Sequence, residues 1–153
     1  KFNYTYTHSR ITTEKRSMEG NEIVTVRQSR PLAGQAAHVA NLSLLYKNTK
    51  HGLNAQLTGS YIGKRLADVS NWYLNDIWEN EYFRMELSAE KSWHSGLEVY
   101  LKATNLLNLP LIRYIMKGPH TEAVSDFPRY RGNIYERKER YGQTLMIGVR
   151  YKL

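Results

Sequence analysis

Hydrophobic and polar residues alternate along most of this chain. The alternation is clearest in Tyr141–Leu153, where every second residue from Leu145 onward is apolar and the residues between include Arg150 and Lys152. A period of two is that of a β-strand with one apolar and one polar face. The same pattern occurs in five other segments: Phe2–Tyr6, Leu42–Tyr46, Leu53–Tyr61, Phe83–Ala89 and Leu97–Ala103. The sequence therefore predicts an all-β protein with about six strands, each close to ~10 residues long.

The connections between these segments are of two kinds. Short turns rich in turn-forming residues lie at 47–52 and 93–96. Long polar links lie at 12–31, 67–80 and 107–140. Because short and long connections alternate, an antiparallel up-and-down meander would place all short turns at one end and all long links at the other. Together with strands of ~10 residues, this asymmetry is typical of a transmembrane outer-membrane β-barrel.

Two of the long links carry signals of their own. The Glu-Gly-Asn-Glu sequence at Glu19–Glu22 is a tight-turn signal, so we expect a hairpin there whose strands continue beyond the membrane. The link at 107–140 is interrupted by prolines and glycines, and we expect it to be irregular and mobile. These interrupting residues are Pro110, Gly118, Pro119, Pro128 and Gly132.

Periodicity alone leaves the surroundings of the two strand faces open. In water, the apolar side would pack on a core, whereas in a barrel it would face lipid and the polar side would face the lumen. The polar side carries charges of both signs, which suit either a hydrated lumen or the outside of a soluble sandwich. They are Arg84, Glu86, Glu90, Glu98, Lys102, Arg150 and Lys152. The difference in length between turns and links favours the barrel. For Glu86 and Glu90, a lumen-lining role is favoured over acid–base catalysis because no nucleophile or positioned base accompanies them.

Composition narrows the class of protein further. Hydrophobic residues make up 41% of the chain, and no stretch approaches the roughly 18 apolar residues of a spanning helix. Tyrosine is abundant, with 12 residues beside 3 phenylalanines and 3 tryptophans, and its apolar ring with a polar tip suits strands and membrane interfaces. The absence of cysteine excludes disulfides and thiolate metal sites. Because the chain begins and ends within a strand pattern, we expect it to be part of something larger.

Three stretches of the sequence resemble one protein family. LEVYLKATNLLNLP (Leu97–Pro110) is similar to the penultimate barrel strand of TonB-dependent outer-membrane receptors, with its Asn-Leu-x-Asn step. YGQTLMIGVRYKL (Tyr141–Leu153) resembles the closing strand of that family, although the family usually ends in an aromatic residue and this chain ends in leucine. RPLAGQAAHVANLSLLYKN (Arg30–Asn48) looks like an earlier downward strand. Within the closing stretch, the sequences Tyr-Gly-Gln-Thr and Arg-Tyr-Lys-Leu resemble the Bacteroidetes branch of the family.

The resemblance implies a fold and a function for the whole chain. Residues 1–153 would form the C-terminal segment of the barrel of an outer-membrane receptor, with the plug domain and N-terminal strands absent. The function would be active uptake of a scarce nutrient, driven by the TonB complex through the missing plug, without catalysis and without a cofactor. Val149, Tyr151 and Leu153 would close the barrel and carry the assembly signal.

Candidate ligand-binding residues lie in two of the long links. Trp72, Tyr73 and Trp78 belong either to an aromatic girdle at the outer interface or to a platform that stacks on a sugar or another flat ligand. Arg129, Tyr130 and Arg131 combine cations with an aromatic ring. They are expected to contact lipopolysaccharide phosphates or an anionic substrate, or to form a solvated loop, and we do not expect nucleic acid as a partner.

Other chemistry finds little support in the sequence. The histidines His8, His38, His51, His94 and His120 are far apart and lack metal-ligand spacing, so no metal site is expected. Haem ligation by His120 remains as an alternative. The net charge of +8 fits contact with an anionic surface or charged, solvated loops.

Several alternatives stay open at this stage. The chain could instead be a soluble all-β binding module with a basic ligand-binding face, or part of a passive, porin-like barrel. Within the receptor class, a siderophore, haem, cobalamin or a glycan could be the substrate, and a surface lipoprotein could be a partner.

Overall fold

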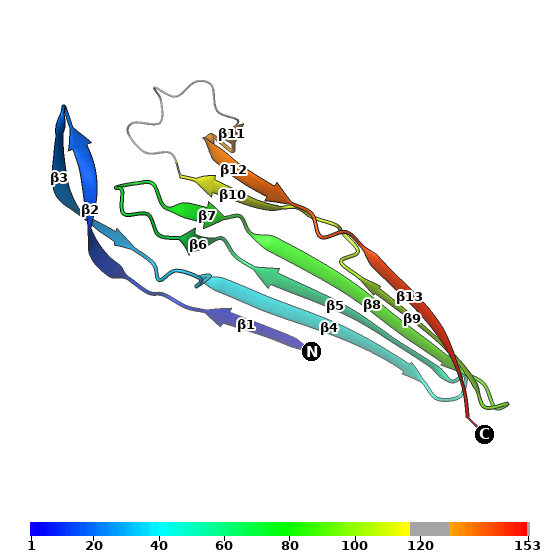
Figure 1. Cartoon of the computed structure of the whole chain (residues 1–153). Helices are drawn as coiled ribbons and strands as arrows, with labels where there is room; N and C mark the ends of the chain where they lie inside the picture. Colours follow the sequence, from blue (N-terminus) through cyan, green and yellow to red (C-terminus); the bar gives the residue numbers. More distant parts are fainter. Residues whose placement is uncertain (117–128, 153) are drawn as a thin grey trace.

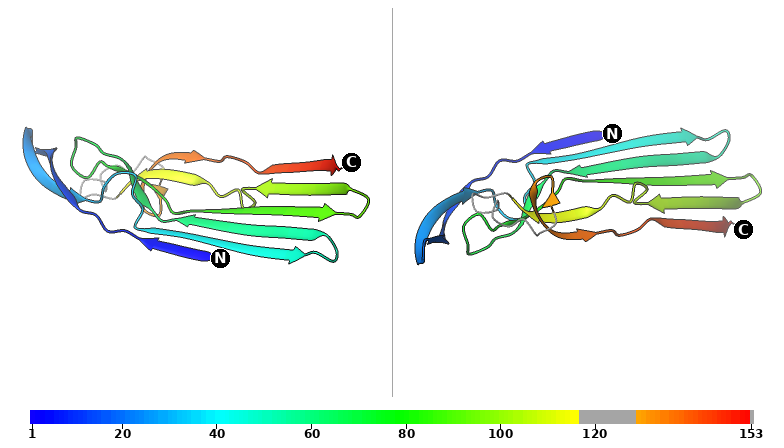
Figure 2. Two further views of the ribbon diagram at one scale, coloured as in Figure 1. Left: turned by 90° about the horizontal axis from the view of Figure 1, so that it is seen from below. Right: turned by 90° about the horizontal axis from the view of Figure 1, so that it is seen from above.

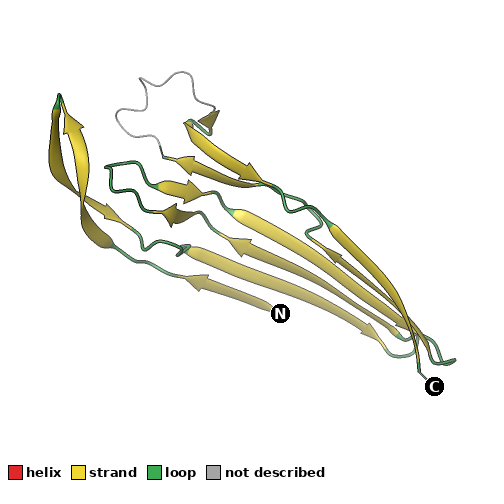
Figure 3. Ribbon diagram, viewed as in Figure 1, coloured by secondary structure: helices red, strands yellow, loops and turns green. Residues whose placement is uncertain are grey.

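A computed structural model describes residues 1–116 and 129–152 of the chain. These residues form thirteen strands in three antiparallel sheets, and none of them is helical (Figure 3). The prediction of an all-β, antiparallel protein is confirmed. Within the described ranges, no helix is long and apolar enough to cross a membrane.

The largest sheet, here called the main sheet, contains all six predicted strands. Its order follows the chain, so each strand pairs with the next one in the meander (Figure 1). The strands are β1 (Phe2–Tyr6), β4 (His38–Asn48), β5 (Leu53–Ile62), β8 (Tyr82–Ser92), β9 (Leu97–Thr104) and β13 (Thr144–Tyr151). Strands β1 and β13 form its two edges, and no sheet among the described residues closes on itself.

The two short turns lie at the same end of the main sheet, as predicted. The β4–β5 and β8–β9 turns are adjacent, and the C-terminal end of β13 lies beside them (Figure 1). Gly52 and Gly96 take φ values of +59° and +81° in these turns, a backbone conformation that favours glycine. Backbone hydrogen bonds of 2.8 Å from Ser92 to Gly52 and 2.9 Å from Lys152 to Gly96 tie this end together. We call it the short-turn end, and the opposite one the long-link end.

The first long link contains the predicted hairpin. Strands β2 (Ile11–Glu19) and β3 (Glu22–Arg30) pair along their whole length, and Gly20 in the connecting turn has a φ of +62°. The hairpin extends from the long-link end, away from the main sheet (Figures 1 and 2).

The other two long links contain regular structure that the sequence did not predict. Five short strands form a second sheet at the long-link end, here called the outer sheet. They are β6 (Arg65–Asp68), β7 (Ile77–Glu79), β10 (Leu111–Ile115), β11 (Arg129–Tyr130) and β12 (Asn133–Glu139). The prediction of an irregular 107–140 link was therefore wrong for its described parts, because β10 pairs on both sides with β7 and β12. Gly118, Pro119 and Pro128 lie outside the described residues.

Four of the five buried apolar residues among the described ones lie outside the main sheet, and the fifth is Ala103 of β9. Leu66 of β6 is completely buried, and Ala36, Ile112 and Tyr114 are nearly so. The segment before β4 covers the edge of β6, because the Gly34 N–H donates to the Leu66 carbonyl at 2.8 Å and Ala36 bridges to Arg65. The outer sheet thus has a small core of its own.

The main sheet has one apolar and one polar face. Residues that pair directly across strands share a face, and one such row crosses the sheet from β4 to β13. This row is Leu44, Leu57, Leu87, Ala103 and Leu145. We call the side of this row the apolar face. Its side chains remain uncovered at both edges, since Leu44 is 54% exposed and Ile147 is 65% exposed. The opposite, polar face carries Ser43, Thr58 and Glu86 in the neighbouring row.

Candidate functional site

Three of the six predicted ligand-binding residues come together on the outer sheet. Trp78 pairs across strands with Tyr114, whose ring lies 5.5 Å from that of Tyr130. The Arg131 guanidinium lies 5.3 Å from the centre of the Tyr130 ring and forms an ion pair with Glu81 at 2.6 Å. Trp78 lies in one long link of the sequence, Tyr130 and Arg131 lie in another, and strand pairing within the outer sheet brings the two links together. For Arg129, the third of the 129–131 group, only the backbone is described, and it pairs with Ile134.

The surroundings of this cluster affect two ionisable groups. A backbone hydrogen bond and the Arg131 guanidinium lower the pKa of Glu81 below its ordinary value of 4.5, so that this side chain stays ionised at neutral pH. Burial raises the pKa of the Tyr114 hydroxyl above 10.0, which keeps it neutral and able to donate a hydrogen bond. The cluster therefore combines aromatic rings with a cation whose charge is balanced by its partner.

Trp72 and Tyr73 lie in a different place. Their segment of the chain runs beside β2, because the Arg16 N–H donates to the Asn71 carbonyl at 2.9 Å and the Tyr73 N–H donates to the Arg16 carbonyl at 2.8 Å. Both aromatic side chains are partly exposed there, at 40% and 37%. The six candidates thus do not form one site, since Trp72 and Tyr73 lie in the link between β6 and β7, beside the β2–β3 hairpin.

A buried ion pair that the sequence did not reveal holds this second group in place. Lys15 of β2 and Asp76 are both almost completely buried, and the ammonium contacts the carboxylate directly. Asp76 also accepts hydrogen bonds from the Ser70 N–H at 2.8 Å and from the Gln28 side chain at 3.4 Å. Removing one partner would leave the other charge buried without compensation, which is strongly destabilising. The pair therefore anchors the hairpin to the link between β6 and β7.

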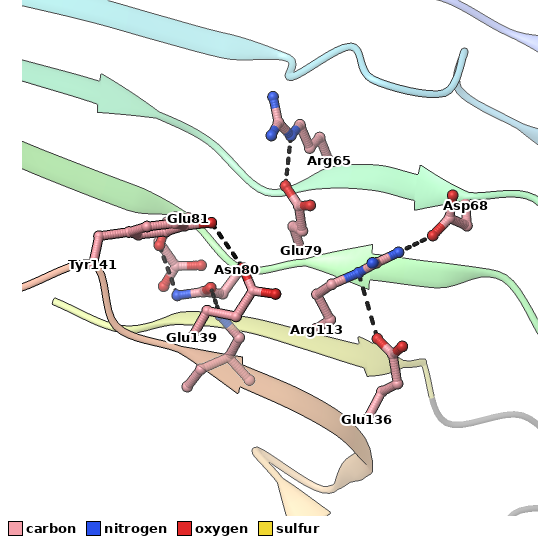
Figure 4. A network of polar contacts seen from close by, with 10 residues as sticks. Arg65, Asp68, Glu79, Asn80, Glu81, Arg113, Glu136, Glu139 and Tyr141 are labelled. Atoms are coloured by element: carbon pink, nitrogen blue, oxygen red, sulfur yellow. Dashed lines mark hydrogen bonds and ion pairs between the residues drawn. The ribbon is translucent and has the colours of Figure 1, made fainter.

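A second polar network holds the outer sheet together (Figure 4). Arg65 pairs with Glu79 at 2.7 Å, and Arg113 lies between Asp68, which it contacts, and Glu136 at 3.4 Å. These residues alternate in sign across neighbouring strands. We therefore interpret these charged residues as structural ion pairs that join the strands of the outer sheet.

The junction between the two sheets is also fixed by hydrogen bonds (Figure 4). The Ile112 N–H donates to the Asn80 side chain at 2.6 Å, and the Asn80 N–H donates to the Ile112 carbonyl at 2.9 Å. The Tyr141 hydroxyl donates to Glu139 at 2.7 Å, and this hydrogen bond raises the pKa of the phenol above 10.0. These bonds join β10 to the segment between β7 and β8, and the end of β12 to the segment that leads into β13.

The polar face of the main sheet carries paired charges. Arg84 lies 3.0 Å from Glu86, and the buried Glu98 carboxylate binds Arg150 at 2.9 Å and Lys152 at 3.5 Å. Glu90 and Lys102, the remaining two charges of the predicted polar side, line a shallow hollow of about 320 Å³ on this face together with Tyr100. Each of these features fits a hydrated, structural surface.

Within the described ranges, no three His, Cys, Asp or Glu side chains are grouped so that they could hold a metal ion. His120, the alternative haem ligand, lies outside these ranges. Val149 and Tyr151 project from β13 on the apolar face, with exposures of 66% and 63%. Leu153, the third residue assigned to barrel closure, is also outside the described residues.

Comparisons with known proteins give no family. No family model matches the chain, and neither the curated proteins nor the solved structures include a significant match. The resemblance to TonB-dependent receptors therefore stays a prediction carried by the sequence stretches that suggested it.

Proposed function

We propose that the chain forms wall strands and outer loops of a TonB-dependent transport receptor in the outer membrane of a Gram-negative bacterium. The observation that carries the proposal is the uncovered apolar face of the main sheet. Phe2 on β1, Leu44 on β4 and Val149 on β13 are all more than half exposed. Soluble monomers seldom leave a continuous apolar surface of this kind in water, whereas the hydrocarbon of a bilayer would cover it without cost.

The two open edges of the main sheet support the same proposal. Unpaired backbone groups cost several kcal/mol each in hydrocarbon, so a sheet in a membrane has to be closed. In a receptor of about 22 strands, β1 and β13 would each pair with a strand outside this chain. Val149, Tyr151 and Leu153 would then take part in barrel closure and assembly.

The difference between the two ends sets the proposed orientation. Short turns are usually periplasmic in outer-membrane barrels and long loops extracellular. The β2–β3 hairpin and the outer sheet would therefore lie outside the cell, where Trp78, Tyr130 and Arg131 would be available to ligand. The chain would perform no covalent chemistry, and the energy for uptake would come from the TonB complex through a plug domain.

Epitope tags in the full-length protein test this orientation. Tags inserted after Gly20 in the β2–β3 turn or after Asp68 at the end of β6 should be labelled by antibody on intact cells. Tags after Thr49 or Ser95, in the two short turns, should be labelled only after the outer membrane is opened. Each tagged protein should remain in the outer-membrane fraction.

Two results would contradict the proposal. Labelling at Thr49 on intact cells would reverse or abolish the proposed topology. Recovery of the untagged protein in the soluble fraction would favour the alternative of a soluble binding module, in which the apolar face is covered by another protein surface.

A further inference from the structure

A pocket of about 480 Å³ lies where the main sheet meets the outer sheet. Its position relative to the two faces follows from two lining residues. Tyr61 is four residues along β5 from Leu57 and therefore points to the same, apolar side. The His38 ring packs against the rings of Tyr4 and Tyr6, which also lie on that side. The cavity, here called the rim pocket, thus opens at the long-link end of the apolar face.

The lining of the rim pocket supplies hydrogen-bond donors and positive charge. Lys64 and His8 line it with exposed side chains, and the His38 imidazole, whose Nδ1 is hydrogen-bonded to the Tyr4 hydroxyl at 2.7 Å, lines it as well. The Ser9 hydroxyl oxygen accepts a hydrogen bond from the Leu32 N–H at 3.1 Å, which leaves its own O–H to donate elsewhere. An ammonium group with neighbouring hydroxyl and imidazole groups is suited to a phosphate.

Two further lining residues suit a sugar. The Gln35 side-chain oxygen is buried and has no hydrogen-bond partner, so a ligand hydroxyl that donated to it would remove an energetic penalty. Trp78 adds an aromatic ring to the lining, as expected for a surface that contacts a sugar. The carboxylate of Glu81 also lines the pocket, but its charge is balanced by Arg131 at 2.6 Å.

We propose that the rim pocket binds the phosphorylated sugar headgroup of an anionic glycolipid in the outer leaflet. The inference rests on the proposed function, because only a membrane at the apolar face brings such headgroups to this position. The site is continuous with the apolar surface at Tyr4 and Tyr6, which are more than half exposed and would lie beside the acyl chains. The rings would sit at the headgroup level, as interfacial tyrosines do. A lipid therefore satisfies both halves of the site, whereas a free sugar phosphate would satisfy only the pocket.

The test uses the full-length protein, purified from outer membranes in detergent. Three probes are compared: lipid A, which is a phosphorylated and acylated glucosamine disaccharide, the same lipid after enzymatic dephosphorylation, and water-soluble glucosamine 1-phosphate. Lipid A should bind most tightly. The variant Lys64→Gln should bind it about tenfold more weakly, as expected when one hydrogen bond to a charged group is lost. Lys50→Gln, at an exposed lysine in the β4–β5 turn, should bind like wild type.

Heat-modifiable mobility of each preparation separates the two proposals. A protein that never shows the mobility of an assembled barrel contradicts the proposed function. An assembled wild type that binds phosphorylated and dephosphorylated lipid equally overturns the rim-pocket inference alone. Unchanged binding by both Lys64→Gln and His8→Gln would overturn it as well. Equal affinity for glucosamine 1-phosphate and lipid A would show that acyl chains do not contribute, and would refute a lipid site.

Discussion

The surroundings of the apolar face can be tested with two adjacent leucines. Leu44 and Leu45 follow each other on β4 and are 54% and 69% exposed. Leu44 pairs with Leu57 and lies on the apolar face, while Leu45 pairs with Gln56 and lies on the polar face. The substitutions Leu44→Arg and Leu45→Arg therefore make the same chemical change at neighbouring positions with similar exposure. They differ only in the face that receives the charge.

The expected magnitudes depend on what the apolar face contacts. In a bilayer, arginine at a midplane position of a barrel strand costs about 2–4 kcal/mol. This free energy corresponds to a factor of roughly 30 to 900 in the folding equilibrium. In water, replacing a half-exposed leucine usually changes stability by no more than about 0.5 kcal/mol. Leu45→Arg should be mild in either case, because its new side chain would lie among Gln56 and the charges of the polar face.

The assay measures full-length variants in their membrane. Outer-membrane abundance and the fraction with heat-modifiable mobility should fall strongly for Leu44→Arg and stay near the wild-type values for Leu45→Arg. Equal tolerance of the two substitutions would refute the assignment of the apolar face to lipid. A larger loss for Leu45→Arg would mean that the faces are reversed.

Two further predictions concern local contacts. Gly148→Ala places a methyl group where the Tyr100 ring lies over β13, so it should destabilise the protein by about 1–3 kcal/mol, measured as a lower urea midpoint. Adding Tyr100→Ala to the same chain should remove most of that loss of stability. An equal loss with and without Tyr100 would contradict the packing. Because the folded-state pKa of Glu81 lies below 4.5, its ion pair with Arg131 should contribute stability above that pH and lose it as the pH falls through the folded-state pKa. The thermal midpoint of wild type relative to Glu81→Gln checks this, and an advantage that grew on acidification would be the wrong sign.

The strands of the main sheet could be predicted from the sequence because their period is local. The segment from Arg84 to Lys91 contains good helix formers, yet its apolar residues recur at every second position and it forms part of β8. The ends of several strands could be predicted from turn-forming residues. Gly20, Gly52 and Gly96 have positive φ in the turns where tight connections were expected. A strand with one apolar face specifies its own register, so the six-stranded meander followed from pattern and connection length.

Only the tertiary structure determined the outer sheet and the grouping of the candidate site. Three of its strands, β6, β7 and β11, are too short for a period to appear, and apolar and polar residues do not alternate in β10 and β12. β7 becomes a strand because β6 and β10 pair with its two sides. The same pairing brings Trp78 to Tyr130 and separates it from Trp72, which is closer in sequence. Lys15 and Asp76 are 61 residues apart, and either would read as a solvated charge by itself. Contacts between distant segments depend on how the whole chain packs, so the residues around a side chain in the sequence do not determine which distant residue it contacts.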